Sequence, residues 1–429
     1  MMTLNSLKGT KDIFWPEIEI WRHLEDISRQ IFNIYSYREI RTPIIEYTSL
    51  FTRSIGKSTD IIQKEMYSFK DKGQRQICLR PEETASVVRS YIQHGALRCR
   101  KVEKLFYIGP MFRSERPQAG RMRQFHQIGV ESIGSRSPLM DAEIMLLLNE
   151  ILSKSKVKNY TFKINNLGCD KCRPHYKDIL KKTIKPHLGK LCSDCKKRYN
   201  LNILRILDCK NESCTRIISN LPIMADYLCP DCKQHFEKLR KLIGKFKIPS
   251  EIDTHLVRGL DYYTGATFEV VAKNLGAKDA VAAGGRYDKL VEELGGSATA
   301  ACGFAIGVER LISSINQKDK DDLAGERRKS LFIYVVCLDE KTRLEGFEIL
   351  SELRKNNICA EMDYSGAQCP SLKSQMRQAN NLGAKYVIII GEDEIREKVL
   401  TIKNMESGKQ EKIAQDKLAH FFNKTVIKK

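Results

Sequence analysis

The sequence predicts an α/β protein that ends in a small doubly wound domain of about 100 residues. Residues 1–168 mix helical stretches with strands and Gly/Pro turns, and strand-like sequence resumes in residues 246–325. Eight of the fourteen cysteines fall in residues 169–245, which predicts an insertion that interrupts the first domain. A charged stretch at residues 318–329 separates the last domain, residues 330–429.

Individual elements of the first domain follow from local patterning. The apolar alternation of residues 104–108 predicts a strand, and Gly109-Pro110 predicts the turn that ends it. After the insertion, further strands are expected at residues 254–257 and 267–271. The same core therefore lies on both sides of the cysteine-rich segment.

The last domain alternates strands and helices. Residues 331–336 and 386–390 are short apolar runs suited to buried parallel strands. Residues 346–354 and 371–382, which lie between them, have helical sequence. This alternation predicts the doubly wound sheet.

Charge and the N-terminal sequence limit the functional classes. Lysine and arginine exceed aspartate and glutamate by 73 − 53 = 20 charges, which suits a polyanionic partner but is equally expected of a lysine-rich surface. Residues 1–10 lack the apolar core of a signal peptide, and no later stretch could span a bilayer. We expect a cytoplasmic protein without a membrane partner, whose cysteines are thiols or metal ligands.

The cysteines of the insertion are spaced as metal ligands. Eight thiols in four pairs predict two tetrahedral zinc sites rather than chance pairs, and they are Cys169, Cys172, Cys192, Cys195, Cys209, Cys214, Cys229 and Cys232. The spacing leaves open which pairs share an ion, although helical sequence at residues 176–188 argues against pairing the first two. The other cysteines are expected to pack as small hydrophobes, namely Cys78, Cys99, Cys302, Cys337, Cys359 and Cys369.

A hairpin in the first domain concentrates charged and polar groups. Residues 112–115 and 124–131 are interpreted as antiparallel strands, joined by a loop at 116–123 that carries three arginines. Successive strand residues point to opposite faces, so Arg113 and Glu115 share one face of the first strand. Gln127, Gly129 and Glu131 share one face of the second strand. A ligand could lie in the gap that Gly129 leaves. The alternative is a solvated hairpin with ordinary surface charges.

A second group of functional side chains lies in residues 258–265. The segment sets a cation, an anion and two phenols between glycines that permit close backbone approach: Arg258-Gly259-Leu260-Asp261-Tyr262-Tyr263-Thr264-Gly265. A buried site for a small zwitterion requires such a set.

These segments resemble the signature motifs of class II aminoacyl-tRNA synthetases, and in detail those of histidyl-tRNA synthetases. Residues 258–265 resemble the histidine-binding signature, and residues 112–131 resemble the second class II motif. Residues 303–310 resemble the third motif, a strand turning into a helix, and residues 37–46, taken as a proline-containing strand, resemble the first. The resemblance implies an antiparallel catalytic sheet flanked by helices, and a C-terminal anticodon-binding domain.

The resemblance also implies which residues meet ATP. Arg113 would bridge the amino acid carboxylate and the α-phosphate, since a planar guanidinium can hold two anions. Arg121 and Arg310 would reach the γ-phosphate, and Glu115 would belong to the same ATP site. Arg258 would stabilise charge on the α-phosphate in the transition state, where other class II enzymes use a metal ion. A structural salt bridge with Asp261 is the alternative for Arg258.

Histidine selection is expected from a different set. By the resemblance, Glu82 and Thr84 hold the α-ammonium, in a segment where Pro81 suits the start of a helix. The imidazole and α-amino group would be surrounded by Gln127, Glu131, Tyr262 and Tyr263, with Arg113 and Arg258 at the carboxylate and a nearly bare wall at residues 283–288. Glu83 replaces the glycine more frequent in the family. It either adds a carboxylate beside the pocket or, as we prefer, belongs to an acidic first helical turn.

The function implied is ligation of histidine to tRNA(His). ATP and histidine would give histidyl-adenylate and pyrophosphate, which leaves with Mg²⁺, and the 3′ end of the tRNA would then accept histidine. The first motif implies a homodimer, whereas zinc is inferred from cysteine spacing alone. Two alternatives are a non-catalytic paralogue that regulates ATP phosphoribosyltransferase and a zinc-dependent nucleic-acid-binding factor.

Overall fold

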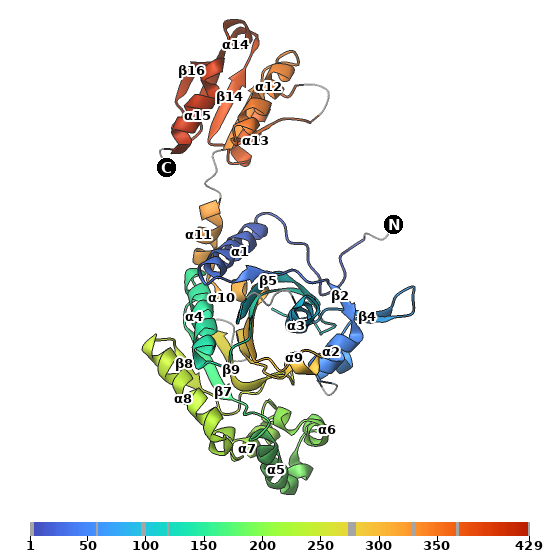
Figure 1. Cartoon of the computed structure of the whole chain (residues 1–429). Helices are drawn as coiled ribbons and strands as arrows, with labels where there is room; N and C mark the ends of the chain where they lie inside the picture. The colour runs from blue at the N-terminus through green and yellow to red at the C-terminus, as the bar shows by residue number, and fades with distance from the viewer. Residues whose placement is uncertain are drawn as a thin grey trace. The chain divides into compact units, whose positions relative to one another are not determined.

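In the computed structural model the chain folds into two compact units, Met1–Ala324 (unit 1) and Gly325–Lys429 (unit 2) (Figure 1). The structure describes residues 4–56, 59–95, 100–117, 120–272, 280–327, 332–365 and 369–427. Gln118 and Ala119 of the arginine-rich loop, Cys99, and the end of the charged stretch at Arg328 and Lys329 therefore lie outside the described residues. Within these ranges, no helix combines the length and apolar character that a membrane crossing requires.

Unit 1 is built on an eight-stranded sheet in the order β1-β5-β6-β11-β10-β9-β7-β8. Its strands are β1 (Arg38–Glu39), β5 (Glu103–Phe112), β6 (Gln124–Ile133), β7 (Tyr160–Asn166), β8 (Ser250–Ile252), β9 (Thr264–Ala272), β10 (Ala280–Arg286) and β11 (Ala301–Gly307). Neighbouring strands are antiparallel except for the outer pairs β1/β5 and β7/β8. The predicted antiparallel core is therefore confirmed.

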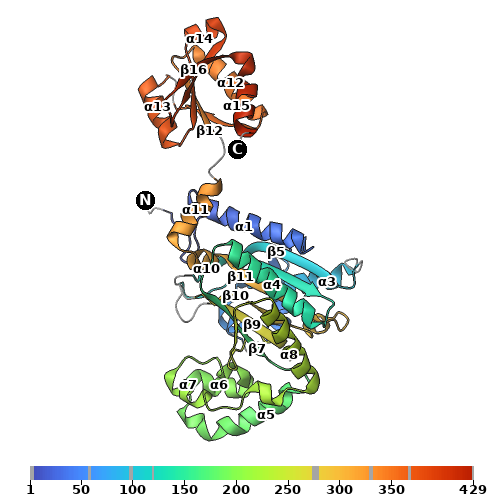
Figure 2. The ribbon, with the colours of Figure 1, turned by 90° about the vertical axis from the view of Figure 1, so that its left-hand side faces the viewer.

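Helices cover one face of this sheet and leave the other for the site. The covering helices are α1 (Glu17–Ile34), α4 (Pro138–Lys154), α8 (Pro230–Lys245) and α10 (Val308–Ser314) (Figure 2). Phe106, Ile128 and Val130 point into their shared core. Because successive strand residues face opposite sides, Tyr107, Gln127 and Glu131 point away from it.

A smaller sheet lies beside the main one, in the order β2-β4-β3. It comprises β2 (Ile45–Tyr47), β3 (Ser68–Lys70) and β4 (Gln76–Leu79), with α2 (Thr48–Ser54), the π-helical turn η1 (Ile61–Glu65), α3 (Thr84–Gln93) and α9 (Leu290–Glu293) nearby. Pro43 lies between β1 and β2 and in neither, so the expectation of a proline-containing strand is wrong. Proline has no N–H to give to a ladder.

Two expected boundaries in the hairpin are corrected. β5 runs straight through Gly109 and Pro110, which pair with Gln127 and His126 of β6, so no turn occurs there. Proline is tolerated because β1 pairs with β5 only at Leu105 and Phe106, which leaves Pro110 without a partner strand on that side. The strand ends at Phe112, so the expected strand at residues 112–115 is limited to its first residue.

Two further expectations near the pocket are wrong. Residues 254–257 form no strand: the N–H of Leu256 donates to the carbonyl of Asp253 at 3.0 Å in a turn, and the side chain of Asn165 donates to the carbonyls of Thr254 and Leu256, 3.3 and 3.0 Å away. Pro81 does not start a helix, since α3 begins at Thr84 after the side chain of Glu82 caps it. The strand expected at residues 267–271 is confirmed within β9.

The cysteine-rich segment consists of short helices below β7 and β9 (Figures 1 and 2). They are α5 (Arg173–Ile184), η3 (Lys185–Lys190), α6 (Ser193–Leu201), η4 (Ile203–Ile206), α7 (Glu212–Ile218) and η5 (Met224–Tyr227), followed by α8. The apolar side chains of the helices before α8 share one core with the cysteines, whereas those of α8 belong to the core of the main sheet.

Unit 2 confirms the small doubly wound domain. Its sheet has the order β13-β12-β14-β15-β16, with β12 (Phe332–Cys337), β13 (Cys359–Met362), β14 (Tyr386–Ile390), β15 (Val399–Asn404) and β16 (Gln410–Ala414). The first three strands are parallel, whereas β15 and β16 add an antiparallel edge that the sequence pattern did not reveal. Helices pack on both faces: α12 (Thr342–Lys355) and α15 (Leu418–Ile427) on one and α13 (Leu372–Asn381) on the other.

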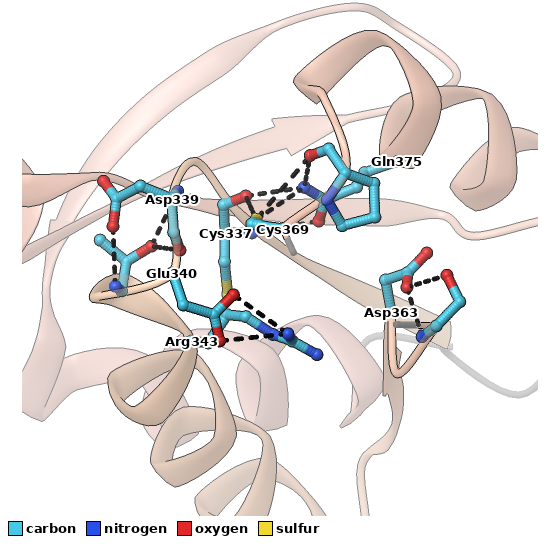
Figure 3. A network of polar contacts seen from close by, with 10 residues as sticks. Cys337, Asp339, Glu340, Arg343, Asp363, Cys369 and Gln375 are labelled. Atoms are coloured by element: carbon cyan, nitrogen blue, oxygen red, sulfur yellow. Dashed lines mark hydrogen bonds and ion pairs between the residues drawn. The ribbon is translucent and has the colours of Figure 1, made fainter. Parts of the chain in front are cut away.

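A polar network closes the carboxyl end of β12 (Figure 3). The buried amide of Gln375 donates to the carbonyls of Cys337 and Pro370, both 2.7 Å away, and accepts from the backbone of Cys337. The Cys369 thiol donates to the same Cys337 carbonyl at 3.0 Å. Cys78, Cys302 and Cys337 are buried as expected, but Cys359 is exposed because β13 is the edge strand.

Candidate active site

One pocket of about 350 Å³ on the open face of the main sheet contains every side chain expected to bind histidine or ATP. They are Glu82, Thr84, Arg113, Glu115, Arg121, Gln127, Glu131, Arg258, Tyr262, Tyr263 and Arg310. These residues come from α3, the β5–β6 hairpin, the loop before β9 and the start of α10, so distant parts of the chain converge here. This convergence excludes the solvated-hairpin alternative.

Strands of the main sheet form the floor of the pocket, and β5 and β6 are two of them. Gln127 and Glu131 point into it from the same face of β6, as the alternation predicts. The space over Gly129 is not open, however, because a methyl group there would lie 2.4 Å from the phenol of Tyr107 on the paired strand. Gly129 therefore makes room for Tyr107, and the expectation that a ligand fills this gap is corrected.

Two buried carboxylates form the centre of one hydrogen-bond network. Glu82 accepts from the backbone N–H groups of Thr84 and Ala85 at 2.7 and 3.0 Å, at the N-terminus of α3. Glu131 accepts from the hydroxyl of Thr84 at 2.7 Å and from Tyr287. Tyr262 donates to Glu82 at 3.4 Å. The network fixes both carboxylates at the pocket wall.

Burial weakens the ionisation of both groups. Desolvation raises the pKa of Glu131 to about 8, which outweighs the hydrogen bonds from Tyr287 and Thr84 that lower it. Desolvation likewise raises the pKa of Glu82, although two helix amides and Arg113 act in the opposite direction. A cationic group entering the pocket would therefore favour the charged form of each carboxylate.

Glu83 points away from this network. Its carboxylate accepts from Arg80 at 2.9 Å and from the hydroxyl of Thr42 at 2.6 Å, and it does not line the pocket. Glu83 precedes the first residue of α3 and is almost fully buried, so it is a structural ion pair rather than a residue of the first helical turn. Burial raises its pKa to about 7.

Arginines gather on the other side of the pocket around Glu115. Arg113 and Arg121 approach this carboxylate to 3.9 and 3.8 Å. Arg113 also donates through Nε to the carbonyl of Pro81 at 2.9 Å, which places it beside Glu82. Arg310 donates to the carbonyls of Gly120 and Ala280 from the strand-to-helix turn between β11 and α10, as the third motif predicts. Arg113 thus stands between the carboxylates and the other arginines.

Arg258 is held by an anion and an aromatic ring. Its guanidinium pairs with Glu269 on β9 and lies 5.5 Å from the ring centre of Tyr263. Asp261 instead accepts a 2.7 Å hydrogen bond from the side chain of Asn202. The alternative salt bridge between Arg258 and Asp261 is therefore wrong, and the anchoring anion is Glu269.

Three buried polar atoms around the pocket have no hydrogen-bond partner in the part of the chain that the structure describes. They are Nε of Arg258, Oε1 of Gln127 and the hydroxyl of Tyr107. A buried polar group without a partner costs free energy unless a ligand or water satisfies it. The pocket therefore offers at least two donors and one acceptor to an occupant.

Sequence reasoning missed several side chains of the pocket, among them Tyr107, Glu269 and Tyr287. Tyr107 pairs with Gly129 across β5 and β6 and could have been found from that pairing. The turn expected at Gly109 prevented the two strands from being aligned this way. Glu269 follows Arg258 at no motif-like spacing and gives no signal of its own. Tyr287 was included in a nearly bare wall, yet its phenol donates to Glu131, and small side chains line the pocket at Ala280, Val281, Ala282 and Ala283 instead.

The eight cysteines of the insertion form two clusters with the geometry of metal sites. The outer cluster joins Cys169 and Cys172 to Cys229 and Cys232, and the inner cluster joins Cys192 and Cys195 to Cys209 and Cys214. Sulfur separations of 3.7 to 3.9 Å match the roughly 3.8 Å expected around a tetrahedral ion with 2.3 Å bonds. Of the four cysteine pairs in chain order, the first therefore shares a cluster with the fourth, and the second shares a cluster with the third. The spacing alone had left this choice open. These clusters could hold metal ions.

Comparisons with known proteins match nearly the whole chain. The family model for histidyl-tRNA synthetase matches residues 9–171 and 176–311, and an anticodon-binding-domain model matches residues 333–425. The chain is 47% identical to the histidine–tRNA ligase of Halothermothrix orenii, over 99% of this chain and all of the relative. It is 48% identical to that of Thermodesulfovibrio yellowstonii, over 95% and 96%. The apo S. aureus histidyl-tRNA synthetase structure is 35% identical with a TM-score of 0.81, over 98% of this chain and all of that one.

The raised pKa of Glu131 predicts a pH dependence of stability. Its carboxyl is neutral in the folded state up to about pH 8, so its contribution to stability is full below its unfolded-state pKa and is lost as pH rises through about 8. Glu131→Gln, which stays neutral, should therefore gain in melting temperature relative to wild type as pH rises from about 5 to about 8.5. Thermal unfolding of both proteins tests this. The exposed Glu237→Gln gives the control, and a constant difference across the range would contradict the prediction.

Proposed function

This chain belongs to the histidyl-tRNA synthetase family, and we propose that the pocket of unit 1 is where it activates histidine with ATP. The enzyme is a histidine–tRNA ligase, an aminoacyl-tRNA ligase for which ATP is a substrate. The observation that carries the proposal for the site is the convergence of all eleven expected histidine and ATP residues on one pocket. Histidine-dependent exchange of pyrophosphate into ATP tests it. Absence of exchange in the intact protein would reject it.

The carboxylate side of the pocket binds the amino acid. The ammonium group of histidine lies against Glu82 and Glu131, whose positions Thr84 fixes through a shared contact. The partnerless Oε1 of Gln127 accepts a hydrogen bond from the substrate, and the hydroxyl of Tyr107 donates one to it. Tyr262 and Tyr263 enclose the imidazole, with ring centres 4.9 Å apart. An amino acid whose side chain leaves these buried polar groups without hydrogen bonds binds more weakly, because the groups have lost their water and gained no partner.

The arginine side binds ATP and aligns the reaction. Arg113 holds the histidine carboxylate and the α-phosphate together, because it lies between Glu82 and the other arginines. A carboxylate oxygen of histidine forms a bond to the α-phosphorus, and the bond from that phosphorus to the bridging oxygen of pyrophosphate breaks. Arg121 and Arg310 bind the γ-phosphate of the departing pyrophosphate. No general base is required, since the carboxylate is already ionised at neutral pH.

Arg258 stabilises the transition state of this step. Negative charge builds on the non-bridging oxygens of the α-phosphate, and a fixed guanidinium is effective there because it needs no reorganisation. Glu269 and the ring of Tyr263 hold its orientation, and its partnerless Nε is one donor left for substrate. Mg²⁺ would be held by Glu115 and Glu309, both at the pocket, together with phosphate oxygens, and would offset the charge of pyrophosphate.

Transfer to tRNA completes the reaction. A hydroxyl of the terminal ribose attacks the carbonyl carbon of histidyl-adenylate, the ester forms, and AMP leaves. Unit 2 binds the anticodon of tRNA(His), in line with the domain model that it matches. The net charge of +20 favours binding of a polyanion through released counterions.

The two cysteine clusters bind zinc. All four donors in each are sulfur, and thiolate sets of this kind select zinc among common cellular divalent ions. Backbone N–H groups of Cys169 and Cys192 donate to the sulfurs of Cys172 and Cys214 at 3.2 and 3.3 Å, which stabilises thiolates. Neither cluster contributes a residue to the pocket. Zinc is thus structural here.

The enzyme acts as a cytoplasmic homodimer. Exposed apolar side chains gather on and beside the small sheet, where the first motif lies: Ile44, Ile45, Tyr47 and Phe69. Exposed apolar groups of this kind are what a second copy would cover. The regulatory paralogue and the zinc-dependent binding factor are disfavoured, because the chain retains residues 258–265, the complete pocket and the anticodon-binding unit.

Arg258→Ala should lower the rate of histidine-dependent pyrophosphate exchange about 10² to 10³ fold, the typical effect of losing one preorganised charge at a transition state. Binding of tRNA should be unchanged, because the residue lies in the pocket. Arg22→Ala, an exposed arginine of α1, serves as the matched control. An Arg258 variant within twofold of wild type would end this assignment.

Glu82→Gln should raise the KM for histidine about tenfold or more and leave the KM for ATP nearly unchanged, since its charge faces the ammonium group. Glu131→Gln should act in the same direction. Steady-state exchange kinetics with each substrate varied in turn measures both effects. Equal increases in the two KM values would show that these carboxylates do not face the amino acid.

Purified protein should contain about two zinc ions per chain, as elemental analysis can measure. Cys192→Ser should lose one of them, whereas Cys359→Ser, the exposed cysteine outside both clusters, should keep both. Chelation should loosen residues 169–232 while part of the exchange activity survives. Metal-free protein with eight freely reactive cluster thiols would contradict the zinc proposal.

A further inference from the structure

The cysteine-rich segment and the histidine-binding loop share one hydrophobic core. The 258–263 loop has no helix or strand of its own, yet Tyr262 and Tyr263 are buried in the same apolar cluster as Cys172, Cys195 and Cys214. Ile203, Leu204 and Ile206 of η4 belong to that cluster as well. The back of the loop is therefore packed against the residues that surround both cysteine clusters.

An arginine beside the outer cluster holds one end of the loop. Arg173 follows Cys172 directly and begins α5. Its guanidinium donates to the carbonyl of Tyr263 at 2.7 Å, and also to those of Leu167 and Gly168 at 3.0 and 3.1 Å. Its backbone N–H donates to the carbonyl of Cys169 at 2.9 Å. The same residue is thus fixed by the cluster and bonded to the loop.

A second arginine, on the inner cluster's side, holds the other end. Arg205 in η4 donates to the carbonyl of Arg258 at 3.0 Å, and Asn202 just before η4 donates to Asp261. Cys209 is tied to η4, because its N–H donates to the carbonyl of Ile206 at 3.0 Å. Gly259 allows this approach, since a methyl group there would lie 3.3 Å from the Arg205 guanidinium.

We propose that the cysteine-rich segment positions the histidine-binding loop through Arg173 and Arg205, which lie beside the outer and the inner cysteine cluster and donate to the carbonyls of Tyr263 and Arg258. Neither arginine lines the pocket, so both act through the loop and neither touches substrate. The inference rests on the proposed function in one respect, namely that the loop binds histidine. If the clusters hold metal, its loss should weaken histidine binding through this loop, although no cysteine takes part in the chemistry.

Arg205→Ala in the full chain tests the inference. It should weaken histidine binding about tenfold, the typical effect of one lost charge-assisted hydrogen bond, with the KM for ATP within twofold of wild type. Calorimetric titration with histidine and exchange kinetics measure the two quantities. Arg205→Lys should recover most of the affinity, because the contact uses a single donor nitrogen. Arg216→Ala, an exposed arginine of α7, is the matched control and should equal wild type.

Two further variants separate positioning from folding. Arg173→Ala should show the same selective loss of histidine affinity. Cys209→Ser should lose one zinc ion and reproduce the Arg205→Ala pattern. An Arg205→Ala protein that binds histidine as tightly as Arg216→Ala, or one that loses ATP and histidine together, would overturn the proposal.

The readouts also distinguish this inference from the proposed function. Wild-type protein without zinc but with a selective Arg205→Ala effect would reject the zinc sites and support the positioning role. Zinc in the wild-type protein, together with unchanged histidine binding by Arg205→Ala, would support the zinc sites and reject the positioning role. Histidine binding without pyrophosphate exchange would reject the proposed chemistry, and the calorimetric comparison would still decide whether the arginines position the loop.

Discussion

The burial of two carboxylates in one pocket is the constraint on which the rest of unit 1 depends. Glu82 and Glu131 are 3% and 1% exposed, so their charge would be costly without compensation. The structure supplies the amides at the start of α3, the hydroxyls of Thr84 and Tyr287, and the guanidinium of Arg113 nearby. These donors come from separate segments of the chain. The long antiparallel sheet holds those segments in register.

Much of this arrangement could be predicted from the sequence because alternation along a strand is local. The shared face of Gln127 and Glu131 and the parallel strands of unit 2 follow from periodicity of two or from short apolar runs, whereas the strand-to-helix turn before Arg310 was implied by the resemblance to the third motif. Motif resemblance added the pocket residues themselves. Tertiary packing decided the rest: β5 passes through Gly109 and Pro110 because one side of the strand is free there.

Contacts between segments far apart in sequence were beyond prediction. Glu269 rather than Asp261 anchors Arg258, since the choice depends on how β9 lies beside the loop and not on adjacency in the chain. Glu83 pairs with Arg80 and Thr42 because the turn before α3 points it away from the pocket. The pairing of cysteines required the fold of α5 and η3, which carry the chain away from Cys172 before it reaches Cys192.

The two cysteine clusters are nested along the chain, which sets an order of assembly. Cys192 and Cys214 of the inner cluster are 22 residues apart, whereas Cys169 and Cys229 of the outer cluster are separated by 60. Closing the longer loop costs about 1 kcal/mol more conformational entropy, so the inner cluster forms more easily in the unfolded chain. Once it has formed, it shortens the effective loop that the outer cluster must close. During synthesis, the inner ligands also leave the ribosome first as a complete set, so the segment can acquire its structure from the inside outward.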